Sequence, residues 1–403
     1  MQLTTARKTV RALELSALLA GALGLSACAN GETNDAASTD SAQPEANASG
    51  EALTVTDVAG REVTFDEQPD RILLAEGRAM FAAAMLNQDD PSENIVALGT
   101  DLREGAPGFE KKISEVDPEI KDLPTVGNIA KGDATVENLL SNDPDVVVMT
   151  MDHKKAAEES GFLDQMDQVG LQYVFTDYRQ KPLENTPKSV TLMGQLLGKE
   201  EKAEEFTDLY EKKVNDIRDR AAKPEDKPST LVWQAAGMKD CCATVKDSNL
   251  GDIVNAAGGD NLGDHLLAGE SGDLTAEKIL AEQPEHIIAT GGAWAKDPEK
   301  SAAIPHVELG YQADEEIADK TLKGLLRTPG FENLEAAKEG RLHGAYHQFY
   351  DSPYNFIALE AFAKWLHPDE FSDVDPEKDF ADFHDEWLPF DYSGTFFNTV
   401  SAE

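Results

Sequence analysis

The chain has 403 residues and a formal net charge of −40, from 76 acidic against 36 basic side chains. This length is typical of two or three domains, and a content of 40 % hydrophobic residues allows a buried core. The charge argues against nucleic acid and against an anionic lipid surface as electrostatic partners, because both are polyanions themselves.

The first 28 residues are predicted to be a signal peptide. Arg7, Lys8 and Arg11 precede an apolar stretch, 12–27, that is too short to span a bilayer comfortably. The stretch ends in "LSAC", which resembles the bacterial lipoprotein lipobox and implies lipidation of Cys28. The alternative is an ordinary signal peptide that is cut near the same place. Lipidation predicts a membrane-anchored protein on the extracytoplasmic side, at the cell surface or in the periplasm.

Residues 29–52 are predicted to be a disordered tether, since they are rich in Ala, Ser, Asn, Asp and Glu and cannot build a core. Residues 53–198 are predicted to form an α/β lobe. A hairpin around Gly60 comes first, and then the short strands in "RILLAEG", "NIVALG", "DVVVMT" and "LQYVFTD" alternate with helical patterns. This alternation predicts right-handed crossovers and a mostly parallel, buried sheet.

Two helices are predicted in the middle of the chain. The first is expected to begin at Thr186 and Pro187, an N-cap followed by proline at the first helical position. The second, within 199–225, should join two lobes. Its apolar residues form a single stripe, namely Phe206, Leu209, Tyr210, Val214 and Ile217. Strand–helix alternation then resumes, so that 226–403 is predicted to form a second α/β lobe with an aromatic-rich tail.

Two stretches 140 residues apart follow the same pattern. "ENLLSNDPDVVVMT" at 137–150 and "EKILAEQPEHIIATGG" at 277–292 each run from a Glu through a Pro–acid step into a β-branched strand. The repetition predicts two pseudo-equivalent halves.

The segments "VTDVAGREVTFDEQPDRILLAEG", "ENLLSNDPDVVV" and "RTPGFENLEAAKEGRLH" resemble the substrate-binding proteins of bacterial iron-complex, haem and cobalamin ABC importers. The resemblance covers roughly residues 53 to 366. It implies an α/β fold of class III, in which two Rossmann-like lobes are joined by a single long helix and grip a ligand between them. It also implies a monomer that delivers this ligand to an ABC importer permease.

In that family one acidic residue on each lobe docks onto basic residues of the permease, and these positions map to Glu137 and Glu277. Two negative charges on separate lobes could match two positive pockets and steer the encounter. The alternative is that each Glu favours only the positive end of its own helix.

Ligands of open α/β sheets bind beyond the carboxyl ends of the strands. This rule selects the predicted ligand-binding residues, which are Arg78, His153, Lys154, Tyr178, Arg179, Met238, Lys239, Trp294, Tyr346, His347 and Tyr350. The basic residues among them favour an anionic ligand such as a ferric catecholate or carboxylate chelate, and the aromatic residues could stack on it. The alternatives are solvated surface bases and aromatic residues of the core.

No protein-bound metal and no cofactor are expected, and iron enters only as part of the chelate. His343 and His347 are four apart, but in the strand expected there they would lie about 13 Å apart. Ligation of haem iron by His153, Tyr346 or His347 stays open. The adjacent Cys241 and Cys242 predict either a vicinal disulfide or two small buried residues.

The leading hypothesis is therefore a lipid-anchored binding protein that delivers a ferric chelate, a siderophore complex, to an ABC importer. Haem or cobalamin as cargo is the alternative within the family. An extracytoplasmic enzyme is the alternative of another class, but the sequence contains no G-x-S-x-G, H-E-x-x-H or Gly-rich phosphate loop. A protein for free zinc or manganese would need convergent ligands, whereas the histidines are scattered.

Overall fold

Parallel strands with apolar side chains on both faces form the centre of the N-terminal half. The computed structural model describes residues 52–238, 241–294 and 306–402, so the predictions for 1–28, for the tether, for Cys28 and for Lys239 lie outside the described residues. The first sheet has the order β5-β4-β3-β6-β7, and all of its pairings are parallel. Its strands are β3 (Ile72–Leu74), β4 (Ile95–Gly99), β5 (Thr125–Val126), β6 (Val146–Thr150) and β7 (Gln172–Thr176).

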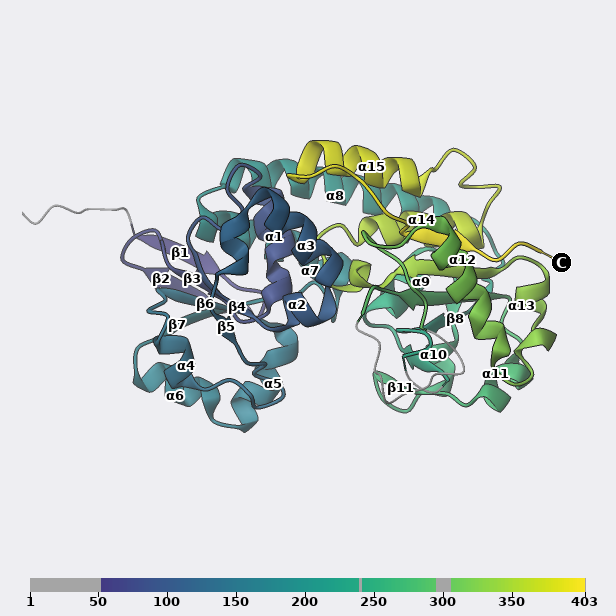
Figure 1. Cartoon of the computed structure of the whole chain (residues 1–403), viewed down its shortest axis with the longest axis horizontal. Helices are drawn as coiled ribbons and strands as arrows, with labels where there is room; N and C mark the ends of the chain where they lie inside the picture. Colours follow the sequence, from purple (N-terminus) through teal and green to yellow (C-terminus); the bar gives the residue numbers. More distant parts are fainter. Residues whose placement is uncertain (1–51, 239–240, 295–305, 403) are drawn as a thin grey trace, which may run out of the picture. The chain divides into compact units, whose positions relative to one another are not determined.

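Helices cover both faces of this sheet (Figure 1), as expected for a parallel sheet whose strands are buried on both sides. Leu74 and Val148 face the core on the side of α1, whereas Leu73 and Val147 face the core that contains α4 and α6. A separate antiparallel hairpin, β1 (Leu53–Thr56) with β2 (Glu62–Phe65), precedes the sheet. The helices of this lobe are α1 (Met80–Leu86), α2 (Asp101–Gly105), α3 (Pro107–Val116), α4 (Val136–Leu140), α5 (Met151–Glu159), α6 (Phe162–Gln168) and α7 (Pro182–Leu197), with 3-10 turns η1 (Gly77–Ala79) and η2 (Pro118–Lys121).

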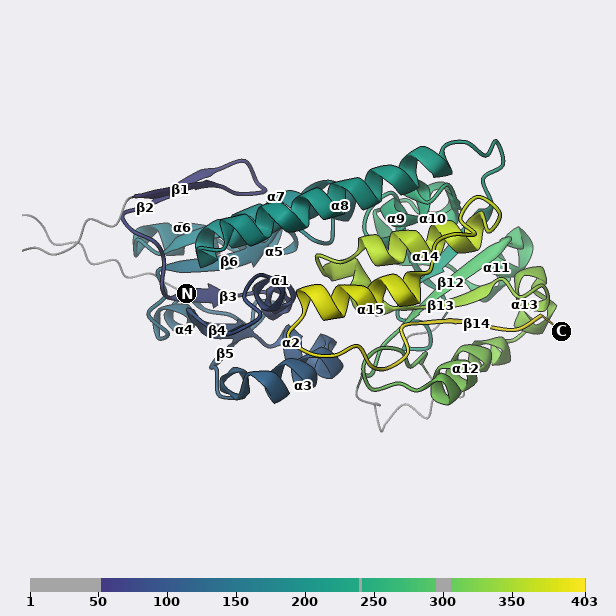
Figure 2. The same ribbon diagram turned by 90° about the horizontal axis from the view of Figure 1, so that it is seen from above.

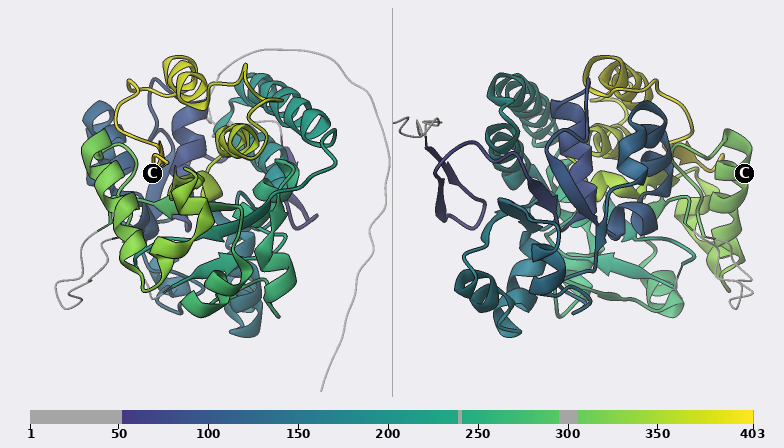
Figure 3. Two further views of the ribbon diagram at one scale, coloured as in Figure 1. Left: turned by 90° about the vertical axis from the view of Figure 1, so that its right-hand side faces the viewer. Right: turned by 60° about the vertical axis from the view of Figure 1, so that its left-hand side comes forward.

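The C-terminal half repeats this plan. Its main sheet has the order β10-β8-β12-β13-β14, in which only β14 is antiparallel to its neighbour among the described strands. The strands of this half are β8 (Ser229–Trp233), β9 (Ala243–Val245), β10 (Asp260–Asn261), β11 (Ser271–Asp273), β12 (His286–Gly291), β13 (Leu342–Tyr346) and β14 (Phe397–Thr399). The left panel of Figure 3 looks onto this lobe from its outer end and shows helices on both faces of its sheet.

The helices of the C-terminal half are α9 (Leu250–Ala256), α10 (Leu262–Leu266), α11 (Ala276–Glu282), α12 (Glu315–Gly324), α13 (Glu335–Lys338), α14 (Phe356–Leu366) and α15 (Pro376–Trp387). Three 3-10 turns join them, η3 (Leu325–Arg327), η4 (Phe331–Asn333) and η5 (His347–Asp351). The aromatic-rich tail packs its rings inward, since Phe380, Phe383 and Phe396 are buried against one another and against neighbouring rings.

The two repeated stretches occupy equivalent places. The order β4-β3-β6-β7 in the first sheet matches β10-β8-β12-β13 in the second, and α4 leads into β6 as α11 leads into β12. Each of these short helices is capped by a threonine: the hydroxyl of Thr135 accepts the N–H of Asn138, and the hydroxyl of Thr275 accepts the N–H of Lys278. The repetition in the sequence therefore reflects two lobes of the same design.

A single long helix, α8 (Glu200–Ala221), joins the lobes and runs alongside both of them (Figure 2). Its 22 residues span about 33 Å at about 1.5 Å per residue. The buried side is the predicted stripe, with Phe206, Tyr210, Val214 and Ile217 in the core and Leu209 partly buried. The predicted fold, two Rossmann-like lobes joined by one long helix, is confirmed. Within the described ranges, no helix combines the length and apolarity that crossing a membrane requires.

The predicted start of the helix before α8 is wrong. Helix α7 begins at Pro182 and contains Pro187 in its interior. The carboxylate of Asp177 explains the earlier start, because it accepts the backbone N–H of Gln180 and of Lys181 and the side-chain amide of Asn185. These bonds fix the backbone directly ahead of Pro182, whereas the hydroxyl of Thr186 caps no helix and accepts the side-chain amide of Asn355.

A buried carboxyl where α8 meets the C-terminal lobe supplies a test of the packing. Glu360 is 2 % exposed and accepts a hydrogen bond from Lys213 of α8 at 2.8 Å. Burial raises its pKa to about 7, although the Lys213 ammonium lowers it. The folded protein thus holds this proton more tightly than the unfolded chain, so the stability that Glu360 contributes increases as the pH falls from about 7 towards 4.5.

We expect Glu360→Gln to remove this dependence. Relative to this variant, the wild type should gain up to about 3 kcal/mol of unfolding free energy between pH 8 and pH 5, at about 1.4 kcal/mol per pKa unit. Urea unfolding at both pH values measures the difference, with Asp208→Asn on the exposed side of α8 as the control. An equal difference at both pH values would contradict the buried, proton-linked carboxyl.

Candidate ligand-binding cleft

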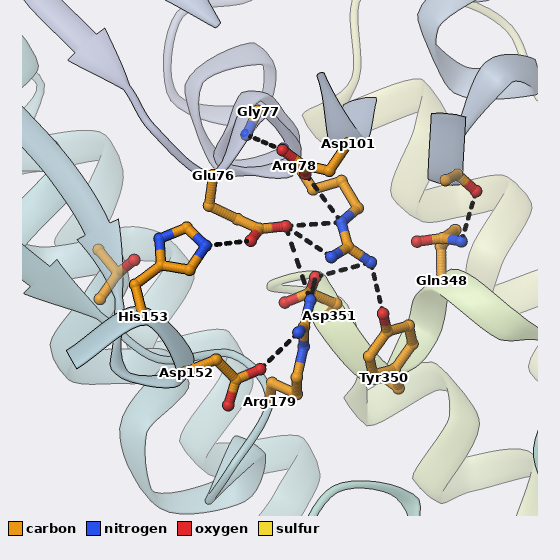
Figure 4. Close-up of polar contacts among 12 residues, drawn as sticks. Glu76, Gly77, Arg78, Asp101, Asp152, His153, Arg179, Gln348, Tyr350 and Asp351 are labelled. Atoms are coloured by element: carbon orange, nitrogen blue, oxygen red, sulfur yellow. Dashed lines mark hydrogen bonds and ion pairs between the residues drawn. The ribbon is translucent and has the colours of Figure 1, made fainter. Parts of the chain in front are cut away.

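Side chains that follow the carboxyl ends of strands in both lobes meet in one cluster (Figure 4). From the N-terminal lobe, Glu76 and Arg78 follow β3, Asp101 follows β4, Asp152 and His153 follow β6, and Arg179 follows β7. From the C-terminal lobe, Tyr350 and Asp351 follow β13 in the turn η5. The arrangement obeys the rule for ligand sites in open α/β sheets and places two guanidinium groups at the junction of the lobes.

Arg78 contacts acidic residues of both lobes. Within its own lobe its guanidinium lies 2.6 Å from Glu76 and 3.0 Å from Asp101. Asp101 also fixes the backbone here, because its carboxylate accepts the N–H groups of Gly77 and Arg78. Across the junction, Nη1 of Arg78 donates to the hydroxyl of Tyr350 and lies 3.1 Å from Oδ2 of Asp351.

Arg179 makes the matching set of contacts. Its Nη1 pairs with Asp152, whose other oxygen accepts the side-chain amide of Gln180 at 2.9 Å. Its Nη2 reaches across to Oδ2 of Asp351 at 2.6 Å and lies 3.6 Å from Glu76. One carboxylate oxygen of Asp351 therefore contacts both guanidinium groups.

Burial sets the electrostatics of the cluster. Glu76 is 4 % and Asp351 is 3 % exposed, and burial raises the pKa of both carboxyls above their usual values against the opposing effect of the two guanidinium groups. The Nε2 of His153 lies 3.5 Å from Glu76, and burial lowers the pKa of this histidine, which favours the neutral ring. Two guanidinium groups thus face four carboxyl groups, and burial disfavours the charged form of two of these, Glu76 and Asp351.

A row of rings from the C-terminal lobe borders the cluster. The ring of Trp294 lies 5.1 Å from that of His347, which lies 4.5 Å from that of Tyr350. The guanidinium of Arg179 is 5.0 Å from the Tyr350 ring, within the range of a cation–π contact. Burial lowers the pKa of His347 to about 3, and its Nδ1 bonds to the hydroxyl of Thr290 at 2.7 Å, so the imidazole is neutral.

A cavity of about 300 Å³ adjoins the cluster and has walls from both lobes. Its lining includes Asp152, Arg179, Gln180, Asn249, His347 and Tyr350. Nearby, Trp294 and Gln348 of the C-terminal lobe both donate to the carbonyl of Gly105, at 3.1 and 2.7 Å. A larger hollow of about 780 Å³ lies among α12, α15 and β14, but its walls carry carboxylates and no residue that the strand-end rule selects.

The structure brings six of the predicted ligand-binding residues to this region, namely Arg78, His153, Arg179, Trp294, His347 and Tyr350. Lys154 instead pairs with Glu158 one turn further along α5. Tyr178 is buried, and Tyr346 packs into the core with its ring 5.2 Å from that of Phe396. Met238 is 36 % exposed next to Lys239, which lies outside the described residues.

None of the four acidic members of the cluster, Glu76, Asp101, Asp152 and Asp351, is in the predicted set of ligand-binding residues. Asp101 follows β4 by two residues, so the strand-end rule would have found it had the rule been applied to that strand. Asp351 carries no signal of its own in "HQFYDSPY", because its importance comes from arginines of the other lobe.

Among the residues that the structure describes, no group of three or more His, Cys, Asp and Glu side chains is arranged to hold a metal ion. His343 lies in β13 as predicted, where its ring stacks on Trp365 at 4.5 Å, whereas His347 bonds to Thr290.

Cys241 and Cys242 form a disulfide. The backbone of Cys242 pairs with that of Leu274, next to the hairpin of β9 and β11. Val245 and Ser271 of this hairpin line the cavity, so the disulfide belongs to a loop region at the edge of the cleft.

The two predicted docking residues lie at equivalent exposed positions, Glu137 in the first turn of α4 and Glu277 in the first turn of α11. The pKa of Glu277 is lowered by a hydrogen bond from its own backbone N–H and by one from Thr275. These two hydrogen bonds are the local helix-end contacts that the alternative interpretation expects for Glu277.

Removal of an arginine from this cluster is expected to lower the free energy of unfolding. Arg78→Met leaves Glu76 and Asp351 buried without a main partner, so we expect it to lower the free energy of unfolding by about 3–5 kcal/mol. Lys154→Met is the matched control, because its surface pair with Glu158 is worth only about 0.3–0.5 kcal/mol. Urea unfolding of the three proteins measures both losses. Equal, small losses would show that the cluster does not hold the lobes together.

The sequence of the chain is similar to those of known binding proteins. Residues 103–345 match the model of a family described as periplasmic binding protein. A Bacillus subtilis (strain 168) protein, described as the uncharacterised ABC transporter substrate-binding lipoprotein YvrC, is 22 % identical over 251 residues, which are 62 % of this chain and 72 % of that protein.

Two solved structures share the fold. The TroA-like periplasmic binding protein FepB from Veillonella parvula is 28 % identical, with a TM-score of 0.78, and the match covers 87 % of this chain and 100 % of that one. The molybdate-binding protein MolA from Haemophilus influenzae is 16 % identical, with a TM-score of 0.64, and the match covers 85 % and 99 %. The chain therefore belongs to the periplasmic binding protein family and is an extracytoplasmic substrate-binding protein of an ABC transporter.

Proposed function

We propose that the chain captures an anionic ferric chelate, a siderophore complex of the catecholate or carboxylate type, between its lobes and delivers it to the permease of an ABC importer. The observation that carries this proposal is the meeting of Arg78 and Arg179 from one lobe with the rings of Tyr350, His347 and Trp294 from the other. The proposal includes lipidation of Cys28, attachment to the membrane through this lipid, and a monomeric protein that performs no catalysis.

The chemistry of these groups fits such a ligand. A guanidinium group presents several N–H donors in a plane and binds the paired oxygens of a carboxylate or a catecholate. Flat rings beside the guanidiniums would stack on the aromatic rings of a catecholate. In a protein with a net charge of −40, two partly buried arginines at the lobe junction are the groups best suited to select an anion.

The size of the cavity indicates how the ligand enters. A volume of about 300 Å³ is at the lower end for small-molecule sites, and a ferric siderophore is larger. Contacts across the junction must therefore open on binding, including those between Asp351 and the arginines. A rigid connection through α8 favours a small rearrangement of the lobes over a wide hinge motion.

Haem is the second candidate, and His347 favours it. Its imidazole is neutral and its Nδ1 is oriented by Thr290, which is how proteins commonly prepare a histidine for a metal centre through Nε2. In that case iron would be bound by the protein as part of its cargo.

Titration of the purified protein identifies the cargo. We expect ferric catecholate or ferric citrate to quench tryptophan fluorescence with saturation at one equivalent, because Trp294 lies in the ring row. Arg179→Gln should weaken this binding by roughly 30-fold or more, the cost of losing one partner of a buried charged contact. Trp294→Phe is the control for the signal, and it should lose most of the quenching.

Saturable binding of haem alone, with a Soret shift that His347→Ala abolishes, would replace the chelate with the second candidate. Binding only of cobalamin or of a cationic ferric hydroxamate would contradict the role of the arginines.

Docking to the permease is tested separately. Glu137→Ala combined with Glu277→Ala should abolish uptake in cells and leave the ligand affinity of the purified protein unchanged, because both carboxylates lie on the surface. The control is Glu115→Ala with Glu316→Ala, which also removes one exposed carboxylate from each lobe. Normal uptake by the first double variant would refute the docking role.

A further inference from the structure

Asp351 is the one acidic member of the described cluster that comes from the C-terminal lobe. The arginines that it contacts come from the N-terminal lobe, and a single oxygen, Oδ2, lies 2.6 Å from Nη2 of Arg179 and 3.1 Å from Nη1 of Arg78. Within their own lobe, Arg78 is also held by Glu76 and Asp101, and Arg179 is held by Asp152. Asp351 thus contacts both guanidinium groups on the side that faces the C-terminal lobe, where Nη1 of Arg78 also donates to the hydroxyl of Tyr350 (Figure 4).

We propose that Asp351 and the anionic group of the ligand compete for these two guanidinium groups, so that the ligand displaces Asp351 when it binds. The inference rests on the proposed function and deepens it, because it identifies the chemical group of the ligand that the two arginines bind. A carboxylate already fits between them, so the ligand should present a carboxylate or catecholate oxygen in the same place.

When a further anion binds, the negative charges of the cluster favour the departure of one of its carboxyl groups. Glu76, Asp101, Asp152 and Asp351 already outnumber the two arginines, and a further anion would meet their combined repulsion. Glu76, Asp101 and Asp152 are fixed beside strand ends of the arginines' own lobe, whereas Asp351 ends the turn η5 of the other lobe and can withdraw with it. Burial raises the pKa of Asp351 and so disfavours its charged form, and the two guanidinium groups oppose this effect.

Polar atoms around Asp351 retain unused bonding capacity. The Nε of Arg179 and the Oε1 of Gln348 are buried and have no hydrogen-bond partner within the described part of the chain. Gln348 belongs to the same turn as Asp351, and its amide nitrogen donates across the junction to Gly105. A ligand larger than one carboxylate could use these atoms, which would favour it over Asp351.

Competition of this kind makes Asp351 a specificity-determining residue. Because it is tethered, it faces the arginines at a high effective concentration, and a ligand must offer stronger anionic contacts in order to replace it. A neutral or cationic chelate gains little from the guanidiniums and should not displace it.

The test compares Asp351→Asn with the wild-type protein by fluorescence titration or calorimetry, using ferric citrate, a ferric tris-catecholate and a cationic ferric trihydroxamate. Asn has nearly the same shape as Asp but pairs weakly with guanidinium. Charge-assisted hydrogen bonds contribute about 1.5–3 kcal/mol, so we expect the variant to bind both anionic chelates roughly 10- to 100-fold more tightly. Binding of the trihydroxamate should change less than about threefold.

Asp273→Asn is the charge-matched control. Asp273 is exposed in β11 of the same lobe as Asp351, so its loss removes the same charge without removing the contact across the junction. We expect a gain for anionic chelates of less than about threefold. Circular dichroism checks the fold of each variant, and Asp351→Ser replaces Asp351→Asn if the latter is unfolded.

Several results would overturn the inference. Equal or weaker binding of the anionic chelates by Asp351→Asn would show that Asp351 supports the ligand or does not meet it. An equal gain in Asp273→Asn would show that the effect is general charge repulsion, and an equal gain for the trihydroxamate would show that it is a loosening of the lobes. If wild type binds an anionic chelate and the Asp351 variants show no gain, only this inference fails; if none of these proteins binds any chelate, the proposed function fails with it.

Discussion

The contact between Asp351 and the guanidinium groups of Arg78 and Arg179 is the constraint on which the cleft depends. Buried charges are tolerated only in pairs or networks, and removal of one partner leaves the others at a large energetic cost. Here the partners come from opposite lobes, so the network holds the lobes together and at the same time places donors for an anion between them. Stability and ligand recognition are consequently properties of the same side chains.

The repeated plan of the chain explains why these residues meet. Each half builds a parallel sheet with the same strand order, and every parallel strand delivers the residues after it to one edge. Helix α8 fixes the two sheets so that these edges face each other, and the lobes add different chemistry. The N-terminal lobe contributes most of the charge, and the C-terminal lobe contributes the rings of Trp294, His347 and Tyr350.

Much of this arrangement was predictable from the sequence, because it follows from periodicity. The alternation of strands and helices predicted the lobes, and the apolar stripe predicted the buried side of α8. The strand-end rule found Arg78 and Arg179. It wrongly assigned Lys154 and Tyr346 to the cleft, because a shift of one residue in the end of a strand changes the direction in which such a side chain points. Helix α5 begins at Met151, directly after β6, which places Lys154 beside Glu158 on its surface. Tyr346, still within β13, points into the core.

Asp351 and Asp177 show what periodicity leaves out. Asp351 acts through arginines of the other lobe, and Asp177 acts through N–H groups three and four residues further along the chain, just ahead of α7. A crystal structure with the ferric chelate that binds most tightly would test the central claim most directly. The account predicts chelate oxygens at about 3 Å from both Arg78 and Arg179, with Asp351 moved away from them. A ligand bound elsewhere, with Asp351 still between the arginines, would contradict it.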